Sequence, residues 1–103
     1  MSTIWKYERH LPQVPEASRI SLGEGQTPLI RSRTIGKALG IENLFFKLEN
    51  LNPTGSYKDR FASVLVSEMV ARKKKVCIAT SSGNTGAALA AYCAAAGITC
   101  MIV

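Results

Sequence analysis

Polar residues recur at helical spacing between positions 58 and 72. Arg60, Ser63 and Ser67 mark one face, while apolar residues fill a broad opposite face. This pattern predicts a helix over 58–72 that packs its apolar side against a sheet.

Two short apolar runs, 76–80 and 98–103, flank an alanine-rich segment over 84–96. The alanines favour a helix, and Gly97 predicts its end, because glycine readily adopts the left-handed conformation that follows many helices. A strand, a helix and a second strand at this spacing indicate a βαβ unit with parallel strands. We therefore expect the two runs to be adjacent strands, with the alanine-rich helix crossing over them.

The N-terminal half has a weaker pattern. Residues 1–21 contain two prolines and no clear period, which predicts an extended arm or a loop packed on the body. Turn residues dominate 23–28, and we expect a short helix over 32–39, ended by Gly40, and then a strand over 44–48. One α/β unit is expected to account for nearly everything after Gly40.

The chain has 103 residues, enough for one small domain, and it stops within the apolar run 98–103. A buried strand at the very end favours the N-terminal portion of a longer domain, truncated at its C-terminal side. By itself this portion is expected to have no useful activity.

Composition excludes several classes of protein. Apolar residues make up 47% of the chain and charged residues 19%, as in ordinary globular proteins rather than disordered ones. No apolar run is long enough to span a bilayer. The charged residues within 1–10 are unlike an export signal, so we expect a cytoplasmic protein.

A net charge of +6 is compatible with nucleic acid, an anionic membrane or a small anionic ligand. The cations are scattered, and the one run, Lys73 to Lys75, follows a predicted helix, where it would complement the helix dipole. A basic nucleic-acid-binding module would need aromatic residues interleaved with cations. Phe45, Phe46 and Phe61 lie in apolar runs instead, so neither nucleic acid nor a membrane is expected as a partner.

Three cysteines, Cys77, Cys93 and Cys100, lie among apolar neighbours. Their number is odd, and neither a paired spacing nor a nearby histidine completes a zinc set. We expect small buried thiols in a reducing compartment, and no metal site.

Lys58 is expected in the first turn of its helix, directly after a Pro-Thr-Gly turn. The N-terminus of a helix carries partial positive charge, which favours the neutral amine that attacks an aldehyde. Position alone favours the alternative of a solvated surface lysine, beside a local charge pair of Asp59 and Arg60.

The segment 80–86, TSSGNTG, follows a predicted strand and begins the alanine-rich helix. Hydroxyls of Ser81, Ser82 and Thr85 and free N–H groups would converge there, where the helix dipole favours negative charge. Taken alone, the segment favours an ordinary helix cap. It matches neither a P-loop nor a dinucleotide fingerprint, so nucleotide binding is disfavoured.

The stretch 47–60, KLENLNPTGSYKDR, resembles the lysine motif K-x-E-x-x-x-P-T-G-S-F-K-D-R of fold-type II pyridoxal-phosphate enzymes. The family also carries an S-x-G-N-T loop at this distance after the lysine. The segment 23–29, GEGQTPL, is similar to the G-E-G-x-T-P-L common in threonine synthases. The resemblance covers roughly 23–103. Tyr57 stands where Phe is usual, and Phe61 where Gly is usual.

The resemblance implies an α/β fold with a three-layer parallel sheet, of which 1–103 would be the N-terminal portion of the catalytic domain. It implies pyridoxal 5'-phosphate as cofactor, with Lys58 as its Schiff-base lysine and proton carrier. Asn84 would bond the pyridine hydroxyl, and Ser81, Ser82 and Thr85 would bind the carboxylate of an amino-acid substrate.

The subfamily resemblance implies a lyase of threonine biosynthesis that converts O-phospho-L-homoserine and water to L-threonine and phosphate. Other fold-type II enzymes stay open, namely a cysteine or cysteate synthase or a threonine dehydratase. A homodimer of the whole enzyme is also left open.

Overall fold

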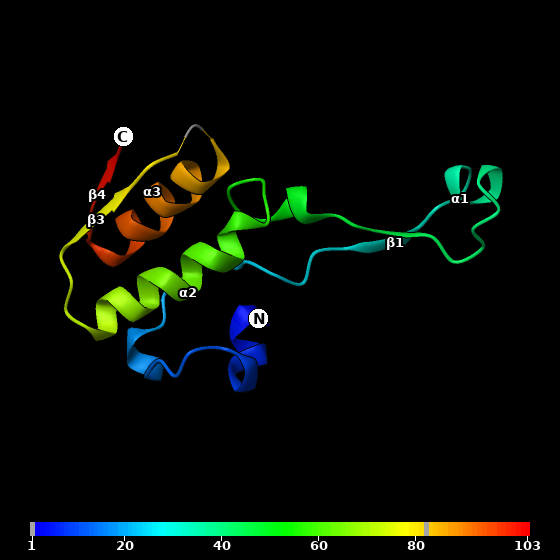
Figure 1. Cartoon of the computed structure of the whole chain (residues 1–103). Helices are drawn as coiled ribbons and strands as arrows, with labels where there is room; N and C mark the ends of the chain where they lie inside the picture. Colours follow the sequence, from blue (N-terminus) through cyan, green and yellow to red (C-terminus); the bar gives the residue numbers. More distant parts are fainter. Residues whose placement is uncertain (1, 82) are drawn as a thin grey trace.

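The computed structural model describes residues 2–81 and 83–103. These residues form an elongated molecule, with extents of 51 × 31 × 19 Å. Figure 1 shows a helical body at one end and a long hairpin that projects away from it.

The body contains the expected βαβ unit. Strands β3 (Val76–Ala79) and β4 (Thr99–Ile102) pair in parallel, with Val76 opposite Thr99, and helix α3 (Asn84–Ala96) connects them. Gly97 ends α3 with φ of 69°, in the left-handed region. The prediction of adjacent parallel strands with a crossing helix is therefore confirmed.

Helix α2 (Lys58–Ala71) packs against α3 and closes the core. Alanines at the contact, Ala62 and Ala88, are fully buried, and their small side chains let the two helices approach closely. Val66 and Leu89 fill the space between them, and burying each contributes about 1.5–3 kcal/mol. The bounds of the predicted helix over 58–72 are thus confirmed to within a residue, but the predicted packing of its apolar side against a sheet is wrong. Helix α2 packs on α3 instead, and Phe61 of the predicted apolar face is exposed. Ser63 and Ser67 of the predicted polar face are fully buried, because their hydroxyls bond the Ile20 backbone.

Burial alternates along β3 and shows which face of the sheet the helices cover. Cys77 is buried in the core, whereas Val76 and Ile78 are exposed, because successive side chains of a strand point to opposite faces. Met101, opposite Ile78, is exposed as well. The described residues thus form a two-stranded parallel sheet with one covered face, and the three-layer sheet stays a prediction.

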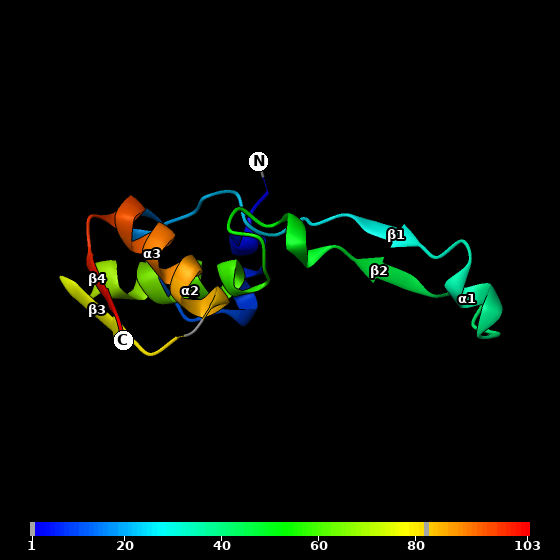
Figure 2. The same cartoon turned by 90° about the horizontal axis from the view of Figure 1, so that it is seen from above.

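The hairpin consists of β1 (Leu29–Arg31) and β2 (Phe45–Lys47), paired antiparallel with Leu29 opposite Lys47 (Figure 2). The expected strand over 44–48 therefore exists, but it lies outside the α/β unit, and that part of the prediction is wrong. The physical reason is the link between the strands, which folds locally at the hairpin tip instead of crossing over a sheet.

The tip carries α1 (Ile35–Ala38), shorter than the helix expected over 32–39. The Ser32 backbone N–H donates to the Leu44 carbonyl at 2.9 Å, and its hydroxyl accepts from the Gly36 N–H at 2.8 Å. Ser32 is therefore held as a strand end and turn residue, which delays the helix. Gly40 follows the helix with φ of 68°.

The N-terminal segment packs on α2. The sequence left open an extended arm or a loop packed on the body, and the structure has the second arrangement. The segment forms two 3₁₀ helices, η1 (Ile4–His10) and η2 (Glu16–Ser18), which the aperiodic sequence did not predict. Trp5 and Val14 are buried in a small separate core with Val64 of α2 packed against it. A third 3₁₀ helix, η3 (Glu49–Leu51), precedes the turn into α2.

None of the helices built by residues 2–81 and 83–103 has the length and apolarity needed to cross a membrane.

Candidate functional site

Helices α2 and α3 begin at the same end of the body. Each runs antiparallel to β3, which lies between them in the chain, so the two helices point the same way (Figures 1 and 2). Lys58 is the first residue of α2 and Asn84 the first of α3. The fold therefore brings Lys58 and Asn84, one from each of the two sequence-predicted segments, to one end of a packed helix pair.

The Lys58 side chain is half-buried at this end. Its backbone N–H donates to the Ser56 hydroxyl at 3.2 Å, and its amine lies 5.2 Å from the centroid of the Tyr57 ring. Among the described residues, the ion pairs leave the Lys58 amine without a carboxylate partner. The amine is thus available for chemistry at the start of α2.

Other lysines are placed differently. The Lys47 amine donates to the Thr27 backbone carbonyl at 2.5 Å, so it supports the loop that precedes β1. Lys37 belongs to α1, at the hairpin tip and far from the helix pair (Figure 1). Lys58 is consequently the lysine that both the motif and the geometry favour.

Ser81 organises the turn before α3. Its hydroxyl oxygen accepts the N–H of Gly86 at 2.8 Å and of Gly83 at 3.1 Å. A hydroxyl that accepts two hydrogen bonds still has its own hydrogen to donate. Ser81 can therefore cap the helix and bind an anion at once, so the predicted cap and the predicted binding role are compatible.

The rest of the predicted set lies around the start of α3. Asn84 is exposed and Thr85 is half-buried. Gly83 precedes the helix and has no side chain with which to cap it, and Ser81 accepts one first-turn N–H, that of Gly86. Ser82, predicted together with Ser81 and Thr85, lies outside the described residues.

Arg60 does not form the local charge pair with Asp59 that was one sequence-based alternative. Its guanidinium binds Glu49 at two points, 2.5 and 3.1 Å, and Asp59 is fully buried. Glu49 also accepts the Thr27 hydroxyl. The hydrogen bonds from Arg60 lower the pKa of Glu49 to about 2, although partial burial by itself would raise it. Glu49 in turn raises the pKa of Arg60. This ion pair ties η3 and the 23–28 loop to the start of α2.

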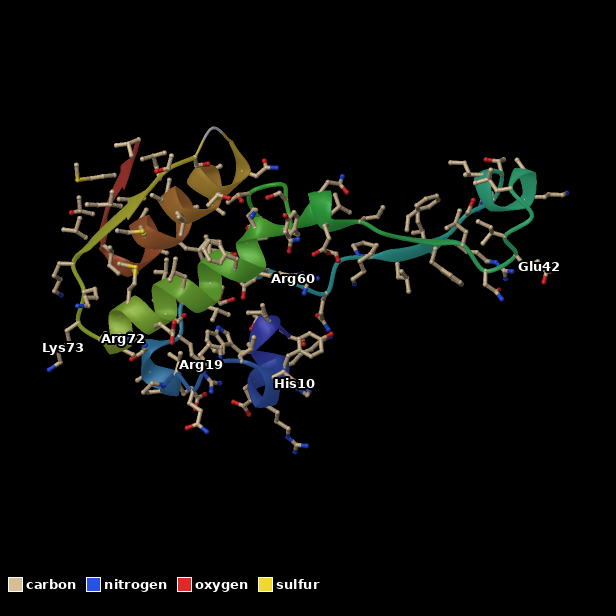
Figure 3. The ribbon with its side chains drawn as sticks, viewed as in Figure 1. His10, Arg19, Glu42, Arg60, Arg72 and Lys73 are labelled. Atoms are coloured by element: carbon tan, nitrogen blue, oxygen red, sulfur yellow. The ribbon has the colours of Figure 1, made fainter. Side chains whose placement is uncertain are left out.

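The basic run that begins at Lys73 does not lie near Lys58. Figure 3 shows Arg72 and Lys73 at the opposite end of α2 from Arg60. The run that begins at Lys73 is exposed and directly follows α2, as predicted for a helix end.

The structure gathers the three cysteines, which sequence spacing did not predict. Cys77 pairs with Cys100 across the strands, and their sulfur atoms lie within 4.8 Å of one another and of Cys93. Burial raises the pKa of Cys93 to about 12, so at neutral pH it is held as the uncharged thiol. The cluster thus contributes apolar packing between the sheet and α3.

Sequence reasoning also missed two buried polar residues, Glu24 and Tyr92. The available signals were the acid between two glycines in GEG and the one aromatic residue in an alanine-rich helix. Neither signal says which partner the residue meets.

Comparison with known proteins identifies the family of the chain. A family model described as "Pyridoxal-phosphate dependent enzyme" matches residues 20–103. The chain is 43% identical to the threonine synthase of Methanocaldococcus jannaschii over 100 residues, which are 97% of this chain and 25% of that protein. It is 41% identical to the threonine synthase of Halalkalibacterium halodurans over 95% of this chain and 27% of that protein. It is 40% identical to the threonine synthase of Mycobacterium tuberculosis, over 94% of this chain and 27% of that protein. The chain therefore spans about a quarter of the length of these curated relatives.

Proposed function

Because this chain belongs to the pyridoxal-phosphate-dependent enzyme family, we propose that it is the N-terminal portion of a threonine synthase. The whole enzyme would convert O-phospho-L-homoserine and water to L-threonine and phosphate. The observation that carries the proposal is the placement of Lys58 and Asn84 at the starts of two helices that begin at one end of the body. The names of the relatives support the choice of subfamily.

The residues at this end fit the family's cofactor, pyridoxal 5'-phosphate. An aldehyde needs an amine, which Lys58 offers outside the ion pairs of the described residues, and a pyridine hydroxyl needs an amide partner, which the exposed Asn84 offers. When bound, the cofactor supplies an electron sink for carbanion chemistry at the substrate. We propose that Lys58 holds it and that Asn84 orients its ring.

The chain's own side chains would then bind the substrate and move a proton. Once its amine is released, Lys58 can take up and return a proton at the substrate, because none of the ion pairs within residues 2–81 and 83–103 holds it. The Ser81 hydroxyl hydrogen, Thr85, Ser82 and the first-turn N–H groups of α3 would hold the substrate carboxylate. These groups suit any α-amino acid, so they support the substrate class more than the individual substrate.

A direct test uses the whole encoded protein, in which 1–103 is the N-terminal portion. It is incubated with pyridoxal phosphate, reduced with borohydride, and digested for peptide mapping. We expect the label on Lys58, and labelling of Lys47 or Lys37 instead would refute the site.

The second measurement concerns the reaction. Phosphate release from O-phosphohomoserine, with threonine as the product, is expected in the cytoplasmic enzyme. Turnover of O-acetylserine with sulfide, or deamination of threonine, with O-phosphohomoserine left intact, would move the protein to another subfamily while the role of Lys58 survived.

A further inference from the structure

Three polar side chains meet in the interior of the body. Glu24, Asp59 and Tyr92 are each fully buried, and they come from the 23–28 loop, the start of α2 and the middle of α3. The Tyr92 hydroxyl lies 2.9 Å from a carboxylate oxygen of Glu24 and 3.2 Å from one of Asp59. One hydroxyl thus joins the 23–28 loop and the start of α2 to the middle of α3.

Each carboxylate is further held by its own loop. Asp59 accepts the Thr54 N–H at 2.9 Å and also the Thr54 hydroxyl. Glu24 accepts the Leu22 N–H at 3.0 Å and the Ser21 hydroxyl at 3.0 and 3.1 Å. The network therefore fixes the backbone of both turns as well as the side chains.

Burying two carboxylates costs more free energy than a purely structural contact requires. Buried carboxylates cost free energy unless hydrogen bonds satisfy them, and apolar residues of similar size would pack at lower cost. Burial and the two neighbouring carboxylates raise the pKa of Tyr92, so its hydroxyl keeps the hydrogen that it donates. That single hydrogen can serve only one carboxylate at a time, which couples the two turns through Tyr92.

The network sits next to the proposed cofactor lysine. Asp59 directly follows Lys58, and adjacent helical residues point about 100° apart, so an inward Asp59 sets the direction of the Lys58 side chain. Tyr92 lies on the helix that begins with Asn84, about two turns further along. A contact between Tyr92 and Asp59 therefore fixes the start of α2 relative to α3.

We propose that Tyr92 and Glu24 are positioning residues, which act through Asp59 to hold the Lys58 amine in register with Asn84. This inference rests on the proposed function of Lys58. Glu24, the acid of the GEG segment, would thus act inside the body. There it would anchor the turn before Lys58 without touching the substrate.

The test compares Tyr92→Phe with Tyr7→Phe, which removes one hydroxyl from an exposed tyrosine in the N-terminal segment. Both carboxylates keep their other donors in Tyr92→Phe, so the fold should persist. The first readout needs no cofactor. Hydrogen exchange of the Thr54 and Leu22 amides in the full chain should accelerate roughly tenfold in Tyr92→Phe and stay unchanged in Tyr7→Phe.

The second readout is the rate at which pyridoxal phosphate becomes trapped on Lys58 in the whole enzyme. We expect a roughly tenfold slower rate in Tyr92→Phe, and a similar fall of kcat with little change of KM. Glu24→Gln, which preserves the side-chain shape, should slow trapping in the same direction. Glu24→Gln therefore still tests the proposal if Tyr92→Phe fails to fold.

A lower melting temperature with wild-type amide exchange and wild-type trapping in Tyr92→Phe would assign the network to core packing alone and overturn the proposal. If pyridoxal phosphate never attaches to Lys58 in the wild type, the proposed function fails. Hydrogen exchange of the Thr54 amide in Tyr92→Phe would then still decide whether Tyr92 positions the Thr54 turn.

Discussion

Glu49 and Arg60 form a two-point ion pair, with nitrogen–oxygen distances of 2.5 and 3.1 Å. The pair links η3 to Arg60, the second residue after Lys58 in the first turn of α2. Both side chains are about a quarter exposed. A planar guanidinium matches a carboxylate at two points, so this contact is stronger and more directional than a single-point pair.

The first prediction concerns acid. Since the pKa of Glu49 is lowered from 4.5 to about 2 in the folded chain, its stabilisation is complete above pH 4.5 and disappears as the pH falls through about 2. Glu49→Gln should lower the free energy of unfolding by about 1 kcal/mol at pH 7, after allowance for solvent screening. Denaturant titrations at several pH values should show wild type and variant converging near pH 2. Glu8→Gln, which breaks a more exposed pair with Arg19, is the control and should have a smaller effect.

The second prediction concerns the lysine itself. In the whole enzyme, Lys58→Ala should abolish the borohydride-trapped cofactor and reduce turnover by roughly 10³-fold or more, because it removes the amine. Lys47→Ala should keep the label, since Lys47 serves the Thr27 carbonyl. Trapped cofactor that persists in Lys58→Ala at wild-type yield would disprove the assignment.

Thr85→Val provides a third prediction, directed at the substrate. The change deletes one hydroxyl donor at the start of α3 and keeps the shape of the side chain. We expect the substrate KM to rise about tenfold while the affinity for pyridoxal phosphate changes little. Equal losses of both affinities would show that Thr85 holds the cofactor.

A fourth prediction follows from the tight turn before α3. A Cβ at Gly86 would lie 3.2 Å from the Ser81 Cβ and hydroxyl oxygen and 3.3 Å from Ile102. Gly86→Ala should therefore destabilise the chain by about 1 kcal/mol, because crowding outweighs the better helix propensity of alanine. Gly83→Ala meets no atom within 4 Å and is the steric control. A higher melting temperature for Gly86→Ala would show that Ser81 moves aside without cost.

The fifth prediction uses the thiols. Cys93 is fully buried and its pKa is raised to about 12, so below that pH it is held as the less reactive thiol. Iodoacetamide at pH 8 should leave Cys93 unmodified in the native chain, and denaturant should expose all three cysteines, as peptide masses would show. Rapid native labelling of Cys93 would mean that α3 separates from the sheet.

The sequence predicted the elements whose signals are local. The bounds of α3 follow from its alanines and from Gly97, and the parallel pairing of β3 with β4 follows from the length of that crossover. The pairing of β1 with β2 could not be predicted, because strands of three residues carry too little alternation to show a partner.

The site divides in the same way. Lys58 and Asn84 could be predicted because each lies in a continuous motif at a helix start. The contact of Tyr92 with Glu24 joins residues that are far apart in the chain, and only the packed helix pair brings them together. A charged residue beside a glycine is usually exposed, so the acid in GEG did not show that Glu24 would be buried.

The hairpin has a practical consequence for engineering. Its tip projects away from the body that carries Lys58, and a side chain added at Gly40 would meet no atom within 4 Å. Gly40 also follows α1 in a left-handed turn at the surface, the kind of position that accepts inserted sequence. A short epitope or a fluorophore-bearing loop placed after Gly40 would therefore report on the protein without disturbing the helix pair.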